Sequence, residues 1–283
     1  MRRFNYFGGG GRLLSSAQAF LEGCKKYKTC YNSDMYHHNY NGVCMKGMRA
    51  FTLAEVLITL GIIGVVAAMT MPVLIQNNIN RTVETRLAKF YSVFNQALKM
   101  AEVEYGDKEG WYQDKNGVIT DEDGNPIEGS SIILEWYNIY LAKHIKTIKI
   151  TVDSEGRPTF YLADGSAFAA AHSNGMRDWI FYSSDPEKCI ARHGSLANAQ
   201  GKCAFRFIYM PLLPANNVEE WKYHRGRGLE AYKYGWDGTS EDLYNNAYAG
   251  CNDSSTCRNC MCTSVIQENG WKIPKNYPYR VSR

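Results

Sequence analysis

The sequence predicts an α+β fold in which one long N-terminal helix packs on an antiparallel sheet. Two observations predict it. A charge-free apolar run passes directly into an amphipathic stretch, so that a single helix is expected over 51–105. Short strand-like runs separated by turn residues follow from position 147 onwards. We therefore divide the 283 residues into a leader at 1–50, a long helix at 51–105 and an α+β globular domain at 106–283.

Charge is distributed unevenly along this chain. Residues 1–50 carry eight Lys or Arg and two acidic residues, whereas 51–283 carry 24 basic and 26 acidic residues. The near-neutral body has no basic surplus of the kind that marks a general nucleic-acid binder, so we expect no specific nucleic-acid partner. A basic N-terminal segment is what the positive-inside rule retains in the cytoplasm.

The first half of the predicted helix has the length and composition of a membrane span. Val56 to Ile75 are 20 residues without a charge. At about 1.5 Å per residue such a helix is about 30 Å long, which is the thickness of the bilayer hydrocarbon. Lys46 and Arg49 precede it, so the sequence predicts a single pass with the C-terminal domain exported. The apolar core of a signal peptide is shorter, about 7–15 residues, so we favour an anchor.

Glu55 stands at the start of the apolar run. A carboxylate at bilayer depth costs a few kcal/mol unless it is paired. If the chain is cut between Ala50 and Phe51, the new N-terminal ammonium lies four residues from Glu55 on the same helical face. The two charges then neutralise each other within one chain or between neighbours. The alternative is that Glu55 marks the membrane boundary and reaches the lipid headgroups.

The second half of the helix is amphipathic. Apolar residues recur every three or four positions, which predicts one face packed on a domain: Ile79, Val83, Leu87, Phe90, Phe94, Ala97 and Ala101. Gly106 is a natural stop for this helix. Pro72 removes one backbone donor and is expected to kink or loosen the helix.

The exported domain reads as strands separated by turns. We expect a surface hairpin or loop at 107–130, a short helix at 132–144, a long ordered loop region after Pro214 and an extended ending at 270–279. Strands are expected at 147–152, 159–162, 167–171, 179–182 and 204–210.

Six cysteines follow the helix, and an even number suits an exported domain with disulfides: Cys189, Cys203, Cys251, Cys257, Cys260 and Cys262. Cys189 and Cys203 flank a segment between two predicted strands. We predict a disulfide between them, which stabilises by about 3 kcal/mol in the loop-entropy model. The last four cysteines are expected to form two further disulfides of open pairing. Zinc is the alternative, because Cys-x2-Cys is a metal-ligand spacing.

Catalytic and cofactor signals are missing from the sequence. No Gly-x-Ser-x-Gly, His-Glu-x-x-His or Walker pattern occurs, so we expect no enzyme and no catalytic residue. We expect no cofactor and no metal site. The acidic turns at 114–125 and 237–242 are candidates for calcium, but neither has the regular alternation of oxygen ligands that an EF-hand needs.

Residues 46–58, KGMRAFTLAEVLI, resemble the prepilin cleavage and methylation motif of type IV pilins and type II secretion pseudopilins. A basic leader, a small residue before the cut, Phe after it and Glu fifth in the mature chain match together. Pro72 would be mature residue 22, where many pilins carry a helix-bending proline. The chain departs from the motif at Ala50, where glycine is commonest, and in its leader of 50 residues. A start at Met45 would give a leader of familiar length.

This resemblance implies a pilin-like fold and a role as structural subunit of a type IV pilus-like or type II secretion pseudopilus filament. It implies cleavage between Ala50 and Phe51 by a prepilin peptidase, N-methylation of Phe51, and pairing of Glu55 with a neighbouring subunit during assembly. The expected partners are other pilin or pseudopilin subunits, the prepilin peptidase, the inner-membrane assembly platform and, before assembly, membrane lipid.

The resemblance also places the chain in the bacterial inner membrane, with its domain in the periplasm or on a surface filament. A minor or tip pilin that acts as an adhesin or binding module is the alternative, because the exported domain of 178 residues is large.

Overall fold

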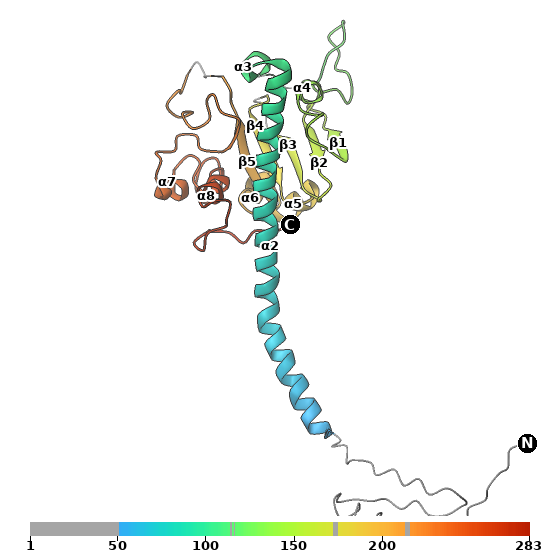
Figure 1. Ribbon diagram of the computed structural model, residues 1–283, viewed down its shortest axis with the longest axis vertical. Coiled ribbons are helices and arrows are strands. Elements are labelled where there is room, and N and C mark those ends of the chain that lie inside the picture. The colour runs from blue at the N-terminus through green and yellow to red at the C-terminus, as the bar shows by residue number, and fades with distance from the viewer. Residues whose placement is uncertain (1–50, 114, 116, 172–174, 213–215) are drawn as a thin grey trace, which may run out of the picture. The chain divides into compact units, whose positions relative to one another are not determined.

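The computed structural model describes residues 51–113, 115, 117–171, 175–212 and 216–283. The chain divides into two units between Met69 and Thr70. This division falls inside the long helix α2, which spans Leu53–Tyr105 (Figure 1). Gly106, with φ +81°, ends α2 at the predicted place, and its amide donates to the carbonyl of Glu102 at 3.0 Å.

Short helices follow α2 in the second unit. They are α3 (Lys108–Trp111), α4 (Ile132–Tyr140), α5 (Pro186–His193), α6 (Leu196–Ala199), α7 (Ser240–Asn245) and α8 (Cys262–Glu268). All but α8 begin at a residue whose side chain accepts a hydrogen bond from an amide of the first turn: Asp107, Ser131, Asp185, Ser195 and Thr239. Local capping therefore fixes where these helices start.

Six antiparallel strands form one sheet in the order β1-β2-β3-β4-β5-β6, so each strand pairs with the next along the chain. The strands are β1 (Lys149–Val152), β2 (Pro158–Tyr161), β3 (Ala167–Ala170), β4 (Asp178–Tyr182), β5 (Ala204–Tyr209) and β6 (Leu229–Ala231). The fold class predicted from the sequence, a long helix on an antiparallel sheet, is confirmed.

The last strand corrects one expectation. The region after Pro214 was expected to be loop, but it contains β6, α7 and α8. β6 pairs with β5, with Phe207 opposite Ala231. A three-residue strand is too short to show the alternation from which strands are read, so only its pairing reveals it.

The main core lies between α2 and one face of the sheet (Figure 1). The predicted stripe of α2 is buried there from Val83 to Ala101, and Ile79 is partly buried. Phe90 is at its centre: its ring centroid lies 4.8 Å from that of Phe181 and 5.2 Å from that of Phe207. Such aromatic pairs add to the free energy gained by burying apolar area.

The side chains on the other face of the sheet, which alternate with the aromatic ones of the main core, include several alanines. Ala167, Ala169 and Ala204 belong to a second cluster that also contains Cys189 and Cys203. The segment between β4 and β5, which includes α5 and α6, supplies this cluster. Small side chains on the strands let that segment pack closely on the sheet.

The C-terminal segment is tied to both α2 and the sheet, as expected for an extended ending. Glu84 of α2 is buried, and its carboxylate accepts from the Ile273 amide at 3.0 Å and from Lys272 Nζ at 3.1 Å. Near the end of the chain, the Ser282 amide donates to the carbonyl of Lys202 at 2.8 Å. The ending thus connects α2 to the segment that leads into β5.

Candidate functional site

The N-terminal end of α2 carries the residues predicted for assembly. The Thr52 amide donates to Glu55 Oε2 at 2.9 Å, and the Glu55 amide donates to Thr52 Oγ1 at 3.2 Å. This reciprocal pair is a capping box, which satisfies two amides of the first helical turn. This local role of Glu55 is additional to the predicted role in assembly, and the spacing Thr52-x-x-Glu55 is its sequence signature.

The apolar half of α2 is exposed. Phe51 is 84% exposed, and of residues 53–75 all except Ala67 are exposed, Pro72 among them. Ala50 and the whole leader, including Met45, lie outside the described residues, so the structure shows only the Phe51 side of the predicted cut. Among the described residues α2 is the one helix long and apolar enough to cross a membrane.

All six cysteines of the domain are paired. A disulfide joins Cys189 to Cys203, as predicted from the sequence. Two more join Cys251 to Cys262 and Cys257 to Cys260, pairings that the sequence leaves open. These bonds correct the zinc alternative, because a disulfide sulfur has no thiolate to offer a metal. A long apolar helix together with disulfides is typical of a single-pass or exported protein.

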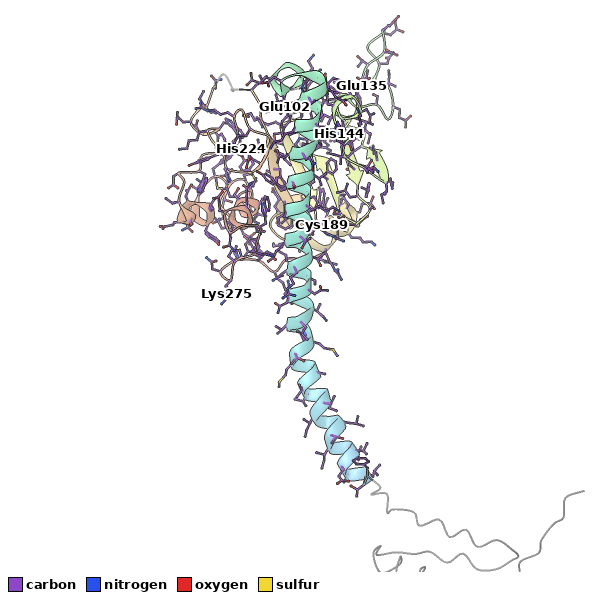
Figure 2. All side chains as sticks on the ribbon, viewed as in Figure 1. Glu102, Glu135, His144, Cys189, His224 and Lys275 are labelled. Atoms are coloured by element: carbon purple, nitrogen blue, oxygen red, sulfur yellow. A yellow bond between two sulfur atoms is a disulfide. The ribbon has the colours of Figure 1, made fainter. Side chains whose placement is uncertain are left out.

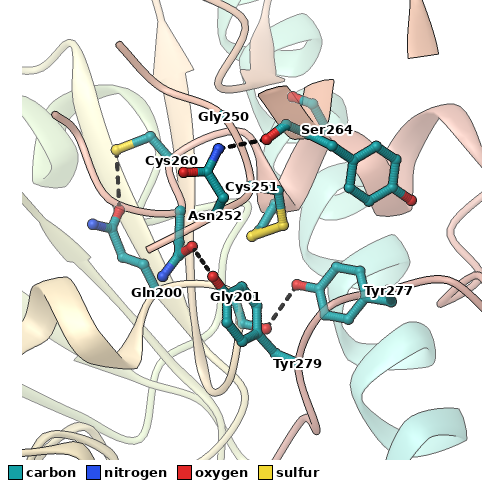
Figure 3. Close-up of a disulfide and its surroundings, with 12 residues drawn as sticks. Gln200, Gly201, Gly250, Cys251, Asn252, Cys260, Ser264, Tyr277 and Tyr279 are labelled. Atoms are coloured by element: carbon teal, nitrogen blue, oxygen red, sulfur yellow. Dashed lines mark hydrogen bonds between the residues drawn. A yellow bond between two sulfur atoms is a disulfide. The ribbon is translucent and has the colours of Figure 1, made fainter. Parts of the chain in front are cut away.

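The Cys251–Cys262 disulfide packs against the turn that leads into β5 (Figure 3). Gly201 has φ +75°, and a Cβ at this position would lie 2.7 Å from Cys262 Sγ. The Tyr277 hydroxyl donates to the Gly201 carbonyl at 2.7 Å (Figure 3). Only glycine fits both the left-handed backbone and the close sulfur.

In the acidic turn at 237–242, a candidate for calcium, the carboxylates of Asp237 and Asp242 accept hydrogen bonds from neighbouring residues. Asp237 Oδ1 accepts from the amide of Thr239 at 2.7 Å and from its hydroxyl at 2.8 Å. Asp242 accepts from Asn246 Nδ2 at 3.0 Å. Within the part of the chain that the structure describes, no three His, Cys, Asp or Glu side chains are grouped so that they could hold a metal ion.

The described histidines come from different elements, and His172 lies outside the described residues. His144 and His224 are labelled in Figure 2. His224 is buried, its Nε2 accepts from the Lys233 amide at 2.9 Å, and burial lowers its pKa to about 3. His193 Nε2 lies 3.3 Å from Ser282 Oγ at the C-terminus. None of these contacts pairs a histidine with a carboxylate.

A polar cavity in the domain was not predicted from the sequence. It has a volume of about 440 Å³ and lies over the face of β4 and β5 opposite α2. We call it the arginine–tyrosine cavity, and its lining includes Arg177, Asp178, Arg206, Trp221, Tyr232, Tyr234 and Tyr248. Nothing in the sequence links the aromatic residues at 221, 232, 234 and 248 to Arg177, just before β4, and Arg206, on β5.

Comparison with known proteins found one family model, described as a family of unknown function, which matches residues 73–281. The match therefore covers the second half of α2 and nearly all of the domain, and it begins after the apolar residues that resemble the prepilin motif. No curated protein and no solved structure matches the chain.

Proposed function

Because the chain belongs to this family of unknown function (DUF6613), we propose its role from its own residues: it is a structural subunit of a type IV pilus-like or type II secretion pseudopilus-like filament. In this role a prepilin peptidase removes the leader and methylates the amine of Phe51. The subunit is anchored in the inner membrane by α2 before assembly. An inner-membrane assembly platform then transfers it to the filament, where α2 packs against other subunits. The domain after α2 faces the periplasm or the filament surface.

The exposed apolar half of α2 is the observation that carries the proposal. Side chains such as Leu57, Ile63 and Leu74 are each about 60% exposed. Burying such a side chain is worth about 1.5–3 kcal/mol, so the segment needs an apolar environment that the described residues do not supply. Lipid supplies it before assembly, and α2 helices of other subunits supply it in a filament.

Two glycines in this half support packing against other helices. Gly61 and Gly64 have nothing within 4 Å of the position a Cβ would occupy, so no contact with the described residues requires glycine there. Glycine in a helix interior costs about 1 kcal/mol relative to alanine. Small residues let neighbouring membrane helices approach closely, so packing against the helix of another subunit would explain both glycines.

Processing is tested by mass spectrometry of the mature N-terminus. The proposal expects a chain that begins at Phe51 and carries a methylated amine. An intact leader, or a first residue other than Phe51, would contradict it.

The charge of Glu55 is tested by two variants that separate assembly from helix capping. Glu55→Gln removes the charge but keeps an oxygen that accepts the hydrogen bonds of Thr52. Thr52→Val removes the cap partner and keeps the carboxylate. With both variants at wild-type levels in the membrane, we expect Glu55→Gln to lower filament yield about tenfold or more, because a charge worth a few kcal/mol loses its partner. Thr52→Val is expected to assemble almost normally.

The two results that oppose this proposal differ. If Glu55→Gln assembles as well as the wild type, pairing with the Phe51 amine is not needed. If Thr52→Val fails as severely as Glu55→Gln, Glu55 acts only as the cap of α2.

A second candidate role, a minor subunit that binds a ligand, is favoured by the arginine–tyrosine cavity. A structural subunit needs no polar cavity on the face of its sheet opposite α2. Counting the copies of the chain per filament separates the two roles, because a tip subunit is present in few copies.

A further inference from the structure

We propose that the arginine–tyrosine cavity binds a sugar unit that carries a carboxylate group. The proposal rests on the second candidate role, ligand binding, and is independent of assembly through α2. The cavity has a volume of about 440 Å³, which lies within the range of small-molecule sites. The charge in the cavity, the fixed position of Arg206 and the aromatic rings of the lining all favour such a ligand.

The charges that line the cavity do not balance. Arg177 Nε and Nη2 each lie 2.9 Å from Asp178 Oδ2, and Arg206 Nη1 lies 3.4 Å from Asp178 Oδ1. The side chains of Asp178 and Arg206 are 3% and 9% exposed. Among the described residues that line the cavity, two guanidinium groups thus share one carboxylate, which leaves one positive charge without a counter-charge. A buried charge without a partner is costly, so an anionic ligand group is favoured here.

Arg206 is held in place before any ligand arrives. Its Nε donates to Gln200 Oε1 at 3.0 Å, and Gln200 Nε2 donates in turn to the Arg258 carbonyl at 3.1 Å. Its guanidinium also lies over the ring of Tyr232, 5.8 Å from the centroid. Among the described residues its Nη2 has no hydrogen-bond partner. A fixed guanidinium with a spare donor loses little conformational entropy when it binds a carboxylate.

Aromatic rings form the rest of the lining. Trp221 and Tyr234 have ring centroids 4.7 Å apart, and Tyr234 and Tyr248 have centroids 5.4 Å apart. Tyr248 is 48% exposed, so part of its ring is open to solvent. The Tyr234 hydroxyl accepts from Asn217 Nδ2 at 3.3 Å. Rings with hydroxyl groups suit a ligand that has both an apolar face and hydroxyl groups, as a sugar has.

The amount of charge distinguishes a carboxylated sugar from other anions. A carboxylate carries one negative charge and so matches the one unbalanced positive charge. A phosphate monoester carries about −1.5 to −2 at neutral pH and would leave negative charge beside Asp178. A nucleic-acid strand needs a row of cations along its backbone, whereas this cavity offers two arginines, one of them already balanced by Asp178.

The proposal is tested by titrating the full chain in detergent micelles and following the heat of binding. The probes are galacturonate and its short oligomers, galactose as the neutral counterpart, galactose 6-phosphate, and a thymidine oligonucleotide. We expect the galacturonates to bind and galactose to bind about tenfold or more weakly, because loss of one charge-assisted pair costs about 1.5–3 kcal/mol.

Two variants and two matched controls accompany this titration. Arg177→Gln and Tyr248→Ala are each expected to weaken binding about tenfold. Tyr248 is exposed, so its loss leaves the core intact even if Arg177→Gln disturbs folding. Arg225→Gln changes an exposed arginine that does not line the cavity, and Tyr105→Ala changes a tyrosine that is 47% exposed and lies elsewhere. Both controls are expected to bind as the wild type does.

Each contrary result overturns the proposal in a recognisable way. Equal binding of galactose and galacturonate would refute the carboxylate requirement but leave a sugar-binding role. Preference for the phosphorylated sugar or the oligonucleotide would assign the cavity to another class of anion. Absence of binding by every probe would refute this proposal, whereas the second candidate role depends on the number of copies per filament and the filament role on Phe51 and Glu55.

Discussion

His224 is a buried side chain that the folded domain holds in its neutral form. Burial is the main cause of its lowered pKa, and the positive charges of Lys233, Arg227 and Arg177 lower it further. Its Nε2 accepts from the Lys233 amide, which requires that nitrogen to be unprotonated. Protonation would therefore cost both the hydrogen bond and the burial of a charge.

This predicts how stability depends on pH. The pKa of His224 falls from its ordinary value of 6.5 to about 3 in the folded protein. Below pH 6.5 the unfolded chain binds a proton that the folded chain does not, so this residue contributes a loss of about 1.4 kcal/mol per pH unit as the pH falls towards 3. Urea unfolding at pH 7.5 and pH 5.0 measures this loss of stability. All six tryptophans lie beyond residue 110, so their fluorescence reports on the domain.

His224→Gln is the comparison for that measurement, since Gln keeps an acceptor but cannot be protonated. The variant is expected to lose about 2 kcal/mol less stability than the wild type between the two pH values. Equal losses in both proteins would show that His224 does not stay neutral.

At the scale of elements, Asn95 connects α2 to β6 as a neighbouring strand would. Its Oδ1 accepts from the Leu229 amide at 2.8 Å, and its Nδ2 donates to the Leu229 carbonyl at 2.9 Å. A Cβ at Gly228 would lie 1.9 Å from Asn95 Oδ1, so this approach requires glycine. The three-residue strand β6 is thus bonded to β5 on one side and to an α2 side chain on the other.

Replacing this amide should destabilise the domain. Asn95→Leu leaves both backbone groups of Leu229 without these partners in a buried place, and we expect a loss of about 2 kcal/mol in unfolding free energy. Gln96→Leu is the matched control, because Gln96 is the next residue of α2 and is exposed. If the two variants unfold at the same urea concentration, the hydrogen bonds of Asn95 to Leu229 do not stabilise the domain.

At the scale of the whole molecule, disulfides hold segments that lie outside the strands of the sheet. The Cys189–Cys203 bond joins residues 14 apart, whereas the Cys257–Cys260 bond joins residues 3 apart. The loop-entropy model assigns about 3 kcal/mol to the longer loop and about 2 kcal/mol to the shorter one. The longer loop also carries the end of α5 and all of α6, which pack on the sheet face opposite α2.

We therefore expect removal of the Cys189–Cys203 pair by double substitution to serine to cost more stability than removal of the Cys257–Cys260 pair. Denaturant unfolding of the full chain in detergent compares the two double variants. A larger loss for the Cys257–Cys260 variant would contradict the loop-length argument.

The sequence by itself determined the features that repeat along the chain. The stripe from Val83 to Ala101 has the period of a helix, and helix geometry then places those residues on one face whatever they pack against. Strands β1 to β5 were read in the same way from apolar runs between turns, and Gly106 marked the end of α2 because a left-handed residue stops a helix.

Only the tertiary structure decided the features that join distant segments. β6 exists because β5 and Asn95 bond to it, and the pairing of Cys251 with Cys262 depends on how the chain folds back between them. The arginine–tyrosine cavity needs Arg206 on β5, Arg177 just before the neighbouring strand β4, and Tyr248 far along the chain. Local periodicity carries no information about such contacts, because they depend on strand register and on how loops return to the sheet.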